Sequence, residues 1–259
     1  MIRLALLIAV LASPVAAADT LLTLTPRAGA TLRVVVDRPA APVGSVILLA
    51  GGLGVLDIDE RGRIEKLGGN HLVRTRSFYA NAGWAAYVPD IASDLKGTSN
   101  YRFSRDHALD LAAVVKVARQ NGGPVAIVGT SRGAVSAANY FTKDTGVPAD
   151  ALVISSGVLF GGDRAQGANG TGDLSRVRVP VMLLRHRDDS CRSTPPGDAD
   201  RFKPLLTGAP KVDIITLTGG GPQNASADPC GASHYHGFLG IDGEAVSATV
   251  NWLAANTRR

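Results

Sequence analysis

Apolar residues recur along the chain in short, nearly continuous runs. Runs of this kind predict strands that are buried on both faces of a mostly parallel sheet. An earlier pair, 21–25 and 31–37, is partly alternating and is separated by a turn at 27–29, which predicts an antiparallel hairpin. The predicted buried strands lie at 43–50, 84–88, 125–128, 151–155, 177–184 and 212–217.

Between these runs, apolar residues are spaced as on one face of a helix. Strands that alternate with helices predict an α/β fold with a mostly parallel central sheet and helices on both faces. The stretch 156–175 is glycine-rich and polar, without a helical period, so we expect no large lid domain. The predicted helices lie at 70–82, 104–120, 133–143, 195–206 and 244–255.

The first 18 residues have the layout of a secretory signal peptide. A positive start is followed by the apolar run 4–11 and by small residues at 16–18. The run is too short to span a bilayer, which takes about 20 apolar residues. We therefore expect residues 1–18 to be removed and residues 19–259 to form one domain. That domain is expected in the periplasm or outside the cell, with no stable membrane insertion after cleavage.

Composition narrows the choice of partners. The chain has 259 residues, of which 45% are hydrophobic and 5% aromatic, and a net charge of +5. Its basic residues are scattered, without the clusters or interleaved aromatics of a nucleic-acid surface. We expect a small-molecule substrate and no nucleic acid, while the oligomeric state stays open.

A motif for a nucleophile lies between the strand at 125–128 and the helix after it. Residues 129–133 read Gly-Thr-Ser-Arg-Gly, which fits G-x-S-x-G, the nucleophile elbow. The motif holds a serine at a strained turn, and glycines on either side let the strand and helix approach closely. Ser131 is therefore the candidate nucleophile.

A serine hydroxyl needs a base, and the base needs a group that orients it. His186, His234 and His236 follow late strands, whose carboxyl ends gather ligands in an open parallel sheet. Elbow hydrolases run serine, acid, histidine along the chain, which favours the last loop, with His236 preferred over His234. The acid is expected after the strand before the last, where Asp189 is preferred over Asp188.

The remaining parts of such a site have candidates as well. The Arg132 N–H and the glycine loop after the strand at 43–50 supply oxyanion donors, with Gly52 preferred and Leu53 next.

Cys191 and Cys230 are expected to pair in an oxidising compartment, which would connect the acid loop to the histidine loop. No metal and no cofactor is implied. Ordinary surface or capping roles are expected for His71 and His107. An acidic substrate stays open as a partner of four arginine side chains, although surface solvation is preferred for each: Arg74, Arg76, Arg102 and Arg132.

These residues together resemble the α/β-hydrolase superfamily over nearly all of residues 19–259. Four stretches resemble a group of small exported bacterial α/β-hydrolases: 72–76, 129–133, 186–191 and 233–238. The chain has the size of a dienelactone hydrolase but a serine in place of that group's cysteine. It departs from many superfamily members at Ala50, where they carry histidine.

The resemblance and the motifs together predict an exported serine hydrolase that cleaves an ester or a related acyl bond through an acyl-enzyme. Ser131, Asp189 and His236 would form the triad. Two other functions stay open at this point: a non-catalytic ligand-binding protein on a hydrolase fold, and a peptidase or amidase with the same triad.

Overall fold

The computed structural model describes residues 20–161, 166–224 and 226–257. The predicted signal peptide, residues 1–18, lies outside the described residues. In the described ranges, no helix has the length and apolar character needed to cross a membrane.

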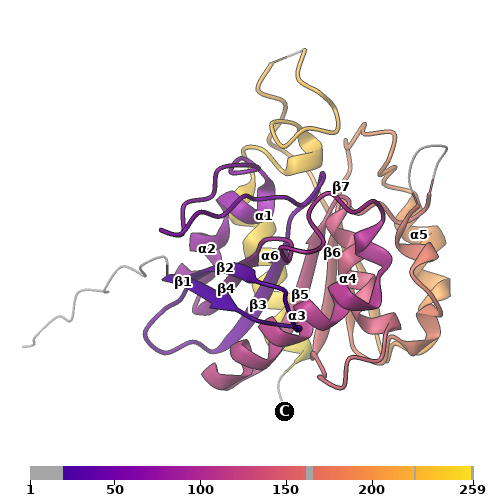
Figure 1. Ribbon diagram of the computed structural model, residues 1–259. Coiled ribbons are helices and arrows are strands. Elements are labelled where there is room, and N and C mark those ends of the chain that lie inside the picture. Colours follow the sequence, from indigo (N-terminus) through magenta and orange to yellow (C-terminus); the bar gives the residue numbers. More distant parts are fainter. Residues whose placement is uncertain (1–19, 162–165, 225, 258–259) are drawn as a thin grey trace, which may run out of the picture.

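An eight-stranded sheet runs through the centre of the molecule (Figure 1). Its order is β1-β2-β4-β3-β5-β6-β7-β8. The hairpin β1–β2 is antiparallel, and β2 pairs antiparallel with β4, while the pairs from β4 to β8 are parallel. The strands are β1 (Thr20–Leu24), β2 (Leu32–Asp37), β3 (Gly44–Leu49), β4 (Trp84–Pro89), β5 (Val125–Thr130), β6 (Ala151–Ser155), β7 (Val181–His186) and β8 (Val212–Leu217).

Helices cover both faces of this sheet, and each face has its own apolar core. The helices α3, α4 and α5 lie on one face, and α1, α2 and α6 lie on the other (Figure 1). Their buried apolar side chains form two separate clusters, one on each face. Since both faces are covered, the central strands are mostly apolar and buried, as the sequence pattern predicts. The helices are α1 (His71–Arg74), α2 (Arg76–Asn81), α3 (Arg105–Ala118), α4 (Gly133–Thr142), α5 (Asp198–Phe202) and α6 (Asp242–Asn256).

Two predicted elements differ from those observed, and each difference has a local cause. The helix expected over 70–82 begins after its cap Asn70, whose side chain accepts the Leu72 N–H, but it divides at Thr75 into α1 and α2. The Thr75 hydroxyl donates to the His71 carbonyl at 2.7 Å, a local bond that competes with the helical ladder. The strand expected over 177–184, with an early interruption at Pro180, starts only at Val181, because Pro180 has no N–H to donate.

The segment 156–175 carries no lid domain in its described part. Short 3₁₀ turns at Ala168–Gly170 and Leu174–Arg176 are its regular structure there. The carboxyl-terminal ends of β3, β5, β6 and β7 therefore lie under loops rather than under an added domain.

Candidate active site

Ser131 stands at the turn between β5 and α4. Its φ is +52°, in the left-handed region that a residue with a Cβ rarely adopts. Its N–H donates to the carbonyl oxygens of Ser155 (3.2 Å), the last residue of β6, and of Ser156 (3.1 Å), the next residue. Strain of this kind, held in place by the surrounding structure, is typical of a functional position.

The two glycines of the motif are required by close packing. A Cβ on Gly129 would clash with the backbone of Gly133, and a Cβ on Gly133 would clash with the carbonyl of Leu49 at the end of β3. The helix α4 thus starts directly against two strands, as the G-x-S-x-G spacing predicts. Gly51, in the loop after β3, is also closely packed, because a Cβ there would come within 2.8 Å of the Ser131 Cβ. The glycine loop is therefore next to the serine.

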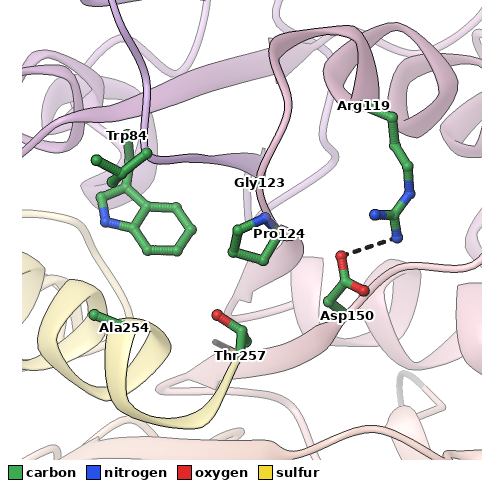
Figure 2. Close-up of a pocket in the computed structure, with 8 residues that line it drawn as sticks. Trp84, Arg119, Gly123, Pro124, Asp150, Ala254 and Thr257 are labelled. Carbon is green, nitrogen blue, oxygen red and sulfur yellow. Dashed lines mark ion pairs between the residues drawn. The ribbon is translucent and has the colours of Figure 1, made fainter. Parts of the chain in front are cut away.

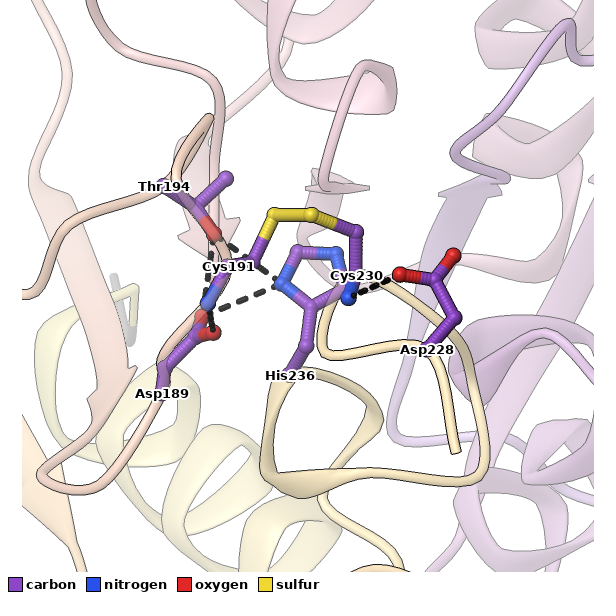
Figure 3. The surroundings of a disulfide bond; sticks show 6 residues. All are labelled: Asp189, Cys191, Thr194, Asp228, Cys230 and His236. Atoms are coloured by element: carbon purple, nitrogen blue, oxygen red, sulfur yellow. Dashed lines mark hydrogen bonds and ion pairs between the residues drawn. A yellow bond between two sulfur atoms is a disulfide. The ribbon is translucent and has the colours of Figure 1, made fainter. Parts of the chain in front are cut away.

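His236 is held by a carboxylate and a hydroxyl (Figure 3). Its Nδ1 lies 3.0 Å from Asp189 Oδ2 and 3.0 Å from Thr194 Oγ1. The Thr194 hydroxyl donates to the same Asp189 oxygen at 3.0 Å, and the other Asp189 oxygen accepts the Cys191 N–H at 2.9 Å. All three side chains are buried. A carboxylate with both oxygens occupied in this way fixes the orientation of the imidazole that it contacts.

Ser131 and His236 line one cavity of about 200 Å³. No hydrogen bond joins the two side chains among the described residues, and such bonds are often long before substrate binds. Backbone of the glycine loop and of the histidine loop completes the walls. The cavity is lined by Gly52, Leu67, Asn70, His71, Thr130, Ser131, Cys230, Gly231, Ala232, His236 and Gly237.

The expected disulfide is present. Cys191 and Cys230 are bonded, with their Cα atoms 4.6 Å apart (Figure 3). Cys191 belongs to the loop of Asp189, and Cys230 belongs to the loop of His236. The bond therefore joins the two loops that carry the candidate acid and the candidate base.

Solved structures of known enzymes share this architecture. A dienelactone hydrolase from Anabaena variabilis matches with a TM-score of 0.63 and 15% identity, over 93% of this chain and 99% of its own. An esterase from Pyrococcus furiosus matches with a TM-score of 0.66 and 14% identity, over 93% and 92%. The acylaminoacyl peptidase of Pyrococcus horikoshii matches at 0.62 and 11%, over 95% of this chain and 43% of its own. The chain has the α/β-hydrolase fold.

No protein-family model and no curated protein sequence matches the chain. Identities of 11 to 15% carry the fold and not the activity. The chemistry of this molecule must therefore follow from its own side chains.

The alternative acid and bases have other partners. Asp188 is exposed and pairs with Arg187, with Oδ1 3.0 Å from the guanidinium Nε, and this bond lowers the pKa of Asp188. His186 is buried, with Nε2 2.8 Å from the Gly219 carbonyl and Nδ1 accepting the Asp188 N–H. His234 lies partly buried with an unpartnered Nδ1 and has no carboxylate among its described contacts.

The expectation of a surface role for His71 is wrong. Its ring is buried, lines the cavity of Ser131 and packs against Phe238, with ring centroids 5.0 Å apart. His71 Nδ1 lies 3.2 Å from Asp242 Oδ1. Burial lowers the pKa of His71 and outweighs the opposite effect of Asp242, so the imidazole is neutral at pH 7.

Arg74 is not a surface arginine either. Its guanidinium forms an ion pair with Asp242 at 2.8 Å and donates to the carbonyl of Gly237 at 2.6 Å. Further bonds reach the carbonyls of Gly69 (2.6 Å) and Ala232 (3.2 Å). Arg74 therefore connects α1 to the loop of His236. Through this contact the 72–76 stretch lies beside the candidate active site.

Arg102 and His107 are the other two corrections. Both are buried and not at the surface. Arg102 lies between the loop after β3 and α4, and His107 lies on α3 and faces α4. Arg102 Nη1 donates to Ser136 Oγ at 2.7 Å, and His107 Nε2 lies 2.9 Å from the same oxygen. Burial, with the charges of Arg102 and Arg27 nearby, lowers the pKa of His107 to about 3, so this imidazole is neutral.

The two candidate oxyanion donors lie beside the serine. Arg132 follows Ser131 directly and precedes α4, while Gly52 lines the cavity with a φ of +54°. Neither the Arg132 N–H nor the Gly52 N–H donates a hydrogen bond to another described residue. Leu53, the second choice in the glycine loop, has a side chain that is 71% exposed.

A larger cavity, of about 610 Å³, lies at the other edge of the sheet (Figure 2). Trp84, Pro124 and Asp150 border it from the amino-terminal ends of β4, β5 and β6, and an Arg119–Asp150 ion pair of 2.9 Å closes one side. It is remote from Ser131 by topology, since the elbow stands at the carboxyl-terminal end of β5. The larger of these two cavities is therefore not the one that contains the candidate catalytic residues.

Proposed function

We propose that the protein is an exported serine hydrolase that cleaves an ester or a related acyl bond. One observation carries the proposal. A strained serine and a buried histidine that contacts a buried aspartate border the same cavity. Chance does not readily bring these three residues together from three distant parts of the chain.

The proposed reaction starts at the Ser131 hydroxyl. His236 takes its proton at Nε2 while the serine oxygen attacks the acyl carbon, and then gives the proton to the leaving alcohol. Asp189 accepts from Nδ1–H and stabilises the imidazolium. Thr194 and the Cys191 N–H keep the Asp189 carboxylate in place. Water then hydrolyses the acyl-enzyme by the same proton transfers in reverse.

The negative charge that develops on the acyl oxygen needs donors. The N–H groups of Arg132 and Gly52 are the proposed pair, because they flank the serine and are otherwise unused among the described residues. Losing one such donor costs about 3–4 kcal/mol of transition-state stabilisation in a well-studied protease.

The size of the cavity favours a small acyl group. Its volume of about 200 Å³ lies below the roughly 300–1,000 Å³ of sites for drug-sized ligands. The walls are mixed, with Leu67 apolar and Asn70 and His71 polar. We therefore propose short-chain esters as the first substrates to test.

A labelling experiment tests the proposal. Purified protein is treated with a fluorophosphonate probe and assayed with p-nitrophenyl esters of two to twelve carbons. We expect label at Ser131 and fastest turnover with the shorter esters. The Ser131→Ala variant should lose both, while Ser99→Ala, at an exposed loop position, should keep both. Folded wild-type protein that takes no label and cleaves no ester would overturn the proposal.

The same assay distinguishes the peptidase alternative. The acylaminoacyl peptidase of Pyrococcus horikoshii shares the fold, so matched p-nitroanilides belong in the panel. Turnover of anilides faster than of esters would replace an esterase with an amidase on the same residues. Tight ligand binding without label would favour a binding protein.

A further inference from the structure

Arg102 is a buried cation directly behind the glycine loop 51–54. Its side chain is 5% exposed. No carboxylate among the described residues pairs with it, and burial lowers its pKa, yet an arginine stays charged in proteins. A buried charge without a counter-ion is costly unless hydrogen-bond acceptors surround it. The hydrogen-bond acceptors around Arg102 therefore indicate which part of the structure its charge stabilises.

Three of these acceptors are consecutive carbonyls of the glycine loop. Nη2 lies 3.1 Å from the Ala50 oxygen, 3.4 Å from the Gly51 oxygen and 3.3 Å from the Gly52 oxygen. One nitrogen thus gathers three carbonyls of one loop. The positive φ of Gly52 allows these consecutive carbonyls to turn to the same side.

The planarity of the peptide links these contacts to the proposed oxyanion hole. In a trans peptide the C=O and N–H point in opposite directions. The Gly51 carbonyl shares its peptide with the Gly52 N–H, and the Gly52 carbonyl shares its peptide with the Leu53 N–H. The Gly51 carbonyl is held by Arg102 Nη2 at 3.4 Å and by the Gly54 N–H at 3.1 Å, so the Gly52 N–H is turned away from the guanidinium. Gly52 itself lines the cavity of Ser131.

Two further contacts fix Arg102 itself. Nη1 donates to the Ser136 hydroxyl on α4 at 2.7 Å, and His107 accepts or donates at the same oxygen. At Gly54 a Cβ would lie 2.5 Å from Nη2, so the loop closes on the guanidinium with no room for a side chain. The arginine is thus locked between α4 and the loop.

We propose that Arg102 is a positioning residue that aims the Gly52 N–H of the glycine loop at the acyl oxygen. The inference rests on the proposed hydrolase function. A guanidinium bonded to the carbonyl side of a peptide also polarises it, which makes the N–H on the other side a stronger donor. Arg102 thus acts on the developing negative charge without touching the substrate.

The test combines kinetics with hydrogen exchange of the loop. Arg102→Lys keeps the charge but removes the planar fork. We expect kcat for a short p-nitrophenyl ester to fall about 10- to 100-fold, with KM within about threefold of the wild type. The amides of 50–56 should exchange faster. Arg105→Lys, the same change at an exposed arginine on α3, should leave kcat and exchange unchanged.

A milder variant covers the case that Arg102→Lys fails to fold. Ser136→Ala frees Nη1 of Arg102 but leaves the loop carbonyls in place, and we expect a smaller loss of kcat with faster exchange at 50–56. Unchanged exchange in the variant that folds overturns the inference, even where activity falls. Faster exchange with unchanged kcat also overturns it. Wild-type protein that hydrolyses no ester overturns the proposed function, while the exchange data still report on the loop.

Discussion

The disulfide between Cys191 and Cys230 connects the loop of the candidate acid to the loop of the candidate base. Asp189 precedes the first cysteine by two residues, and its carboxylate accepts the Cys191 N–H at 2.9 Å. His236 follows the second cysteine by six residues. The bond therefore constrains both partners of the Asp189–His236 contact.

Removing the disulfide should weaken both stability and activity. The bonded residues are 39 apart, for which the chain-entropy model gives about 4 kcal/mol of stabilisation before any relaxation of the native state. In the Cys191→Ser/Cys230→Ser variant we expect the free energy of unfolding to fall by about 2–4 kcal/mol and kcat to fall with it. Denaturation in urea and ester kinetics measure the two. Activity that stays at the wild-type level in folded variant would show that the bond serves stability alone.

The choice between two neighbouring aspartates is the second prediction. Asp189 is buried against His236, whereas Asp188 is exposed and bonded to Arg187. Asp189→Asn should lower kcat by up to about 10⁴-fold, because the amide favours the wrong imidazole tautomer. The matched control Asp188→Asn should change kcat less than threefold. An equal effect of the two changes would refute the assignment.

The sequence predicts the fold well because its signals are local, and the motif of the candidate nucleophile is local too. Strand runs and the Gly129–Gly133 motif need only neighbours along the chain, and packing at Gly133 follows from the same spacing. Asp189 and His236 follow from chain order, and the structure brings them within 3.0 Å. Their roles in catalysis remain predictions that the variants above test.

What the sequence did not predict is the burial of charged groups. Arginines are exposed by default, so Arg74 and Arg102 were expected in water. Only the tertiary fold shows carbonyls converging on them, from residues up to 163 positions away for Arg74. Thr194 has no local signal at all. Its hydroxyl meets Asp189 and His236 because the chain turns back after Cys191.

Acid should destabilise the protein through His107. Its pKa is about 3 in the fold and about 6.5 in the unfolded chain, so between these values the unfolded state binds the additional proton. The stabilisation is complete above pH 6.5 and is lost as the pH falls toward 3, by at most about 1.4 kcal/mol per pH unit. His71 contributes in the same direction, because burial also lowers its pKa.

The His107→Gln variant removes the group that binds this proton on unfolding, so comparison with the wild type measures its contribution. We expect its free energy of unfolding to fall less steeply between pH 6.5 and 4 than that of the wild type, even where the variant is less stable at pH 7. Urea denaturation at several pH values measures the slope. Identical slopes in the two proteins would show that His107 takes up no proton on unfolding.

The last prediction concerns His71 as a wall of the proposed acyl site. The imidazole lines the cavity of Ser131, and Asp242 anchors it from the far side at 3.2 Å. His71→Ala should enlarge the cavity while Arg74 continues to neutralise Asp242. Each additional CH₂ that becomes buried is worth about 0.8 kcal/mol, or about fourfold in kcat/KM. We therefore expect the ratio of kcat/KM for hexanoate over acetate esters to rise at least fourfold. Phe78→Ala, at an exposed site on α2, is the control. A ratio that stays at the wild-type value would show that the acyl chain binds elsewhere.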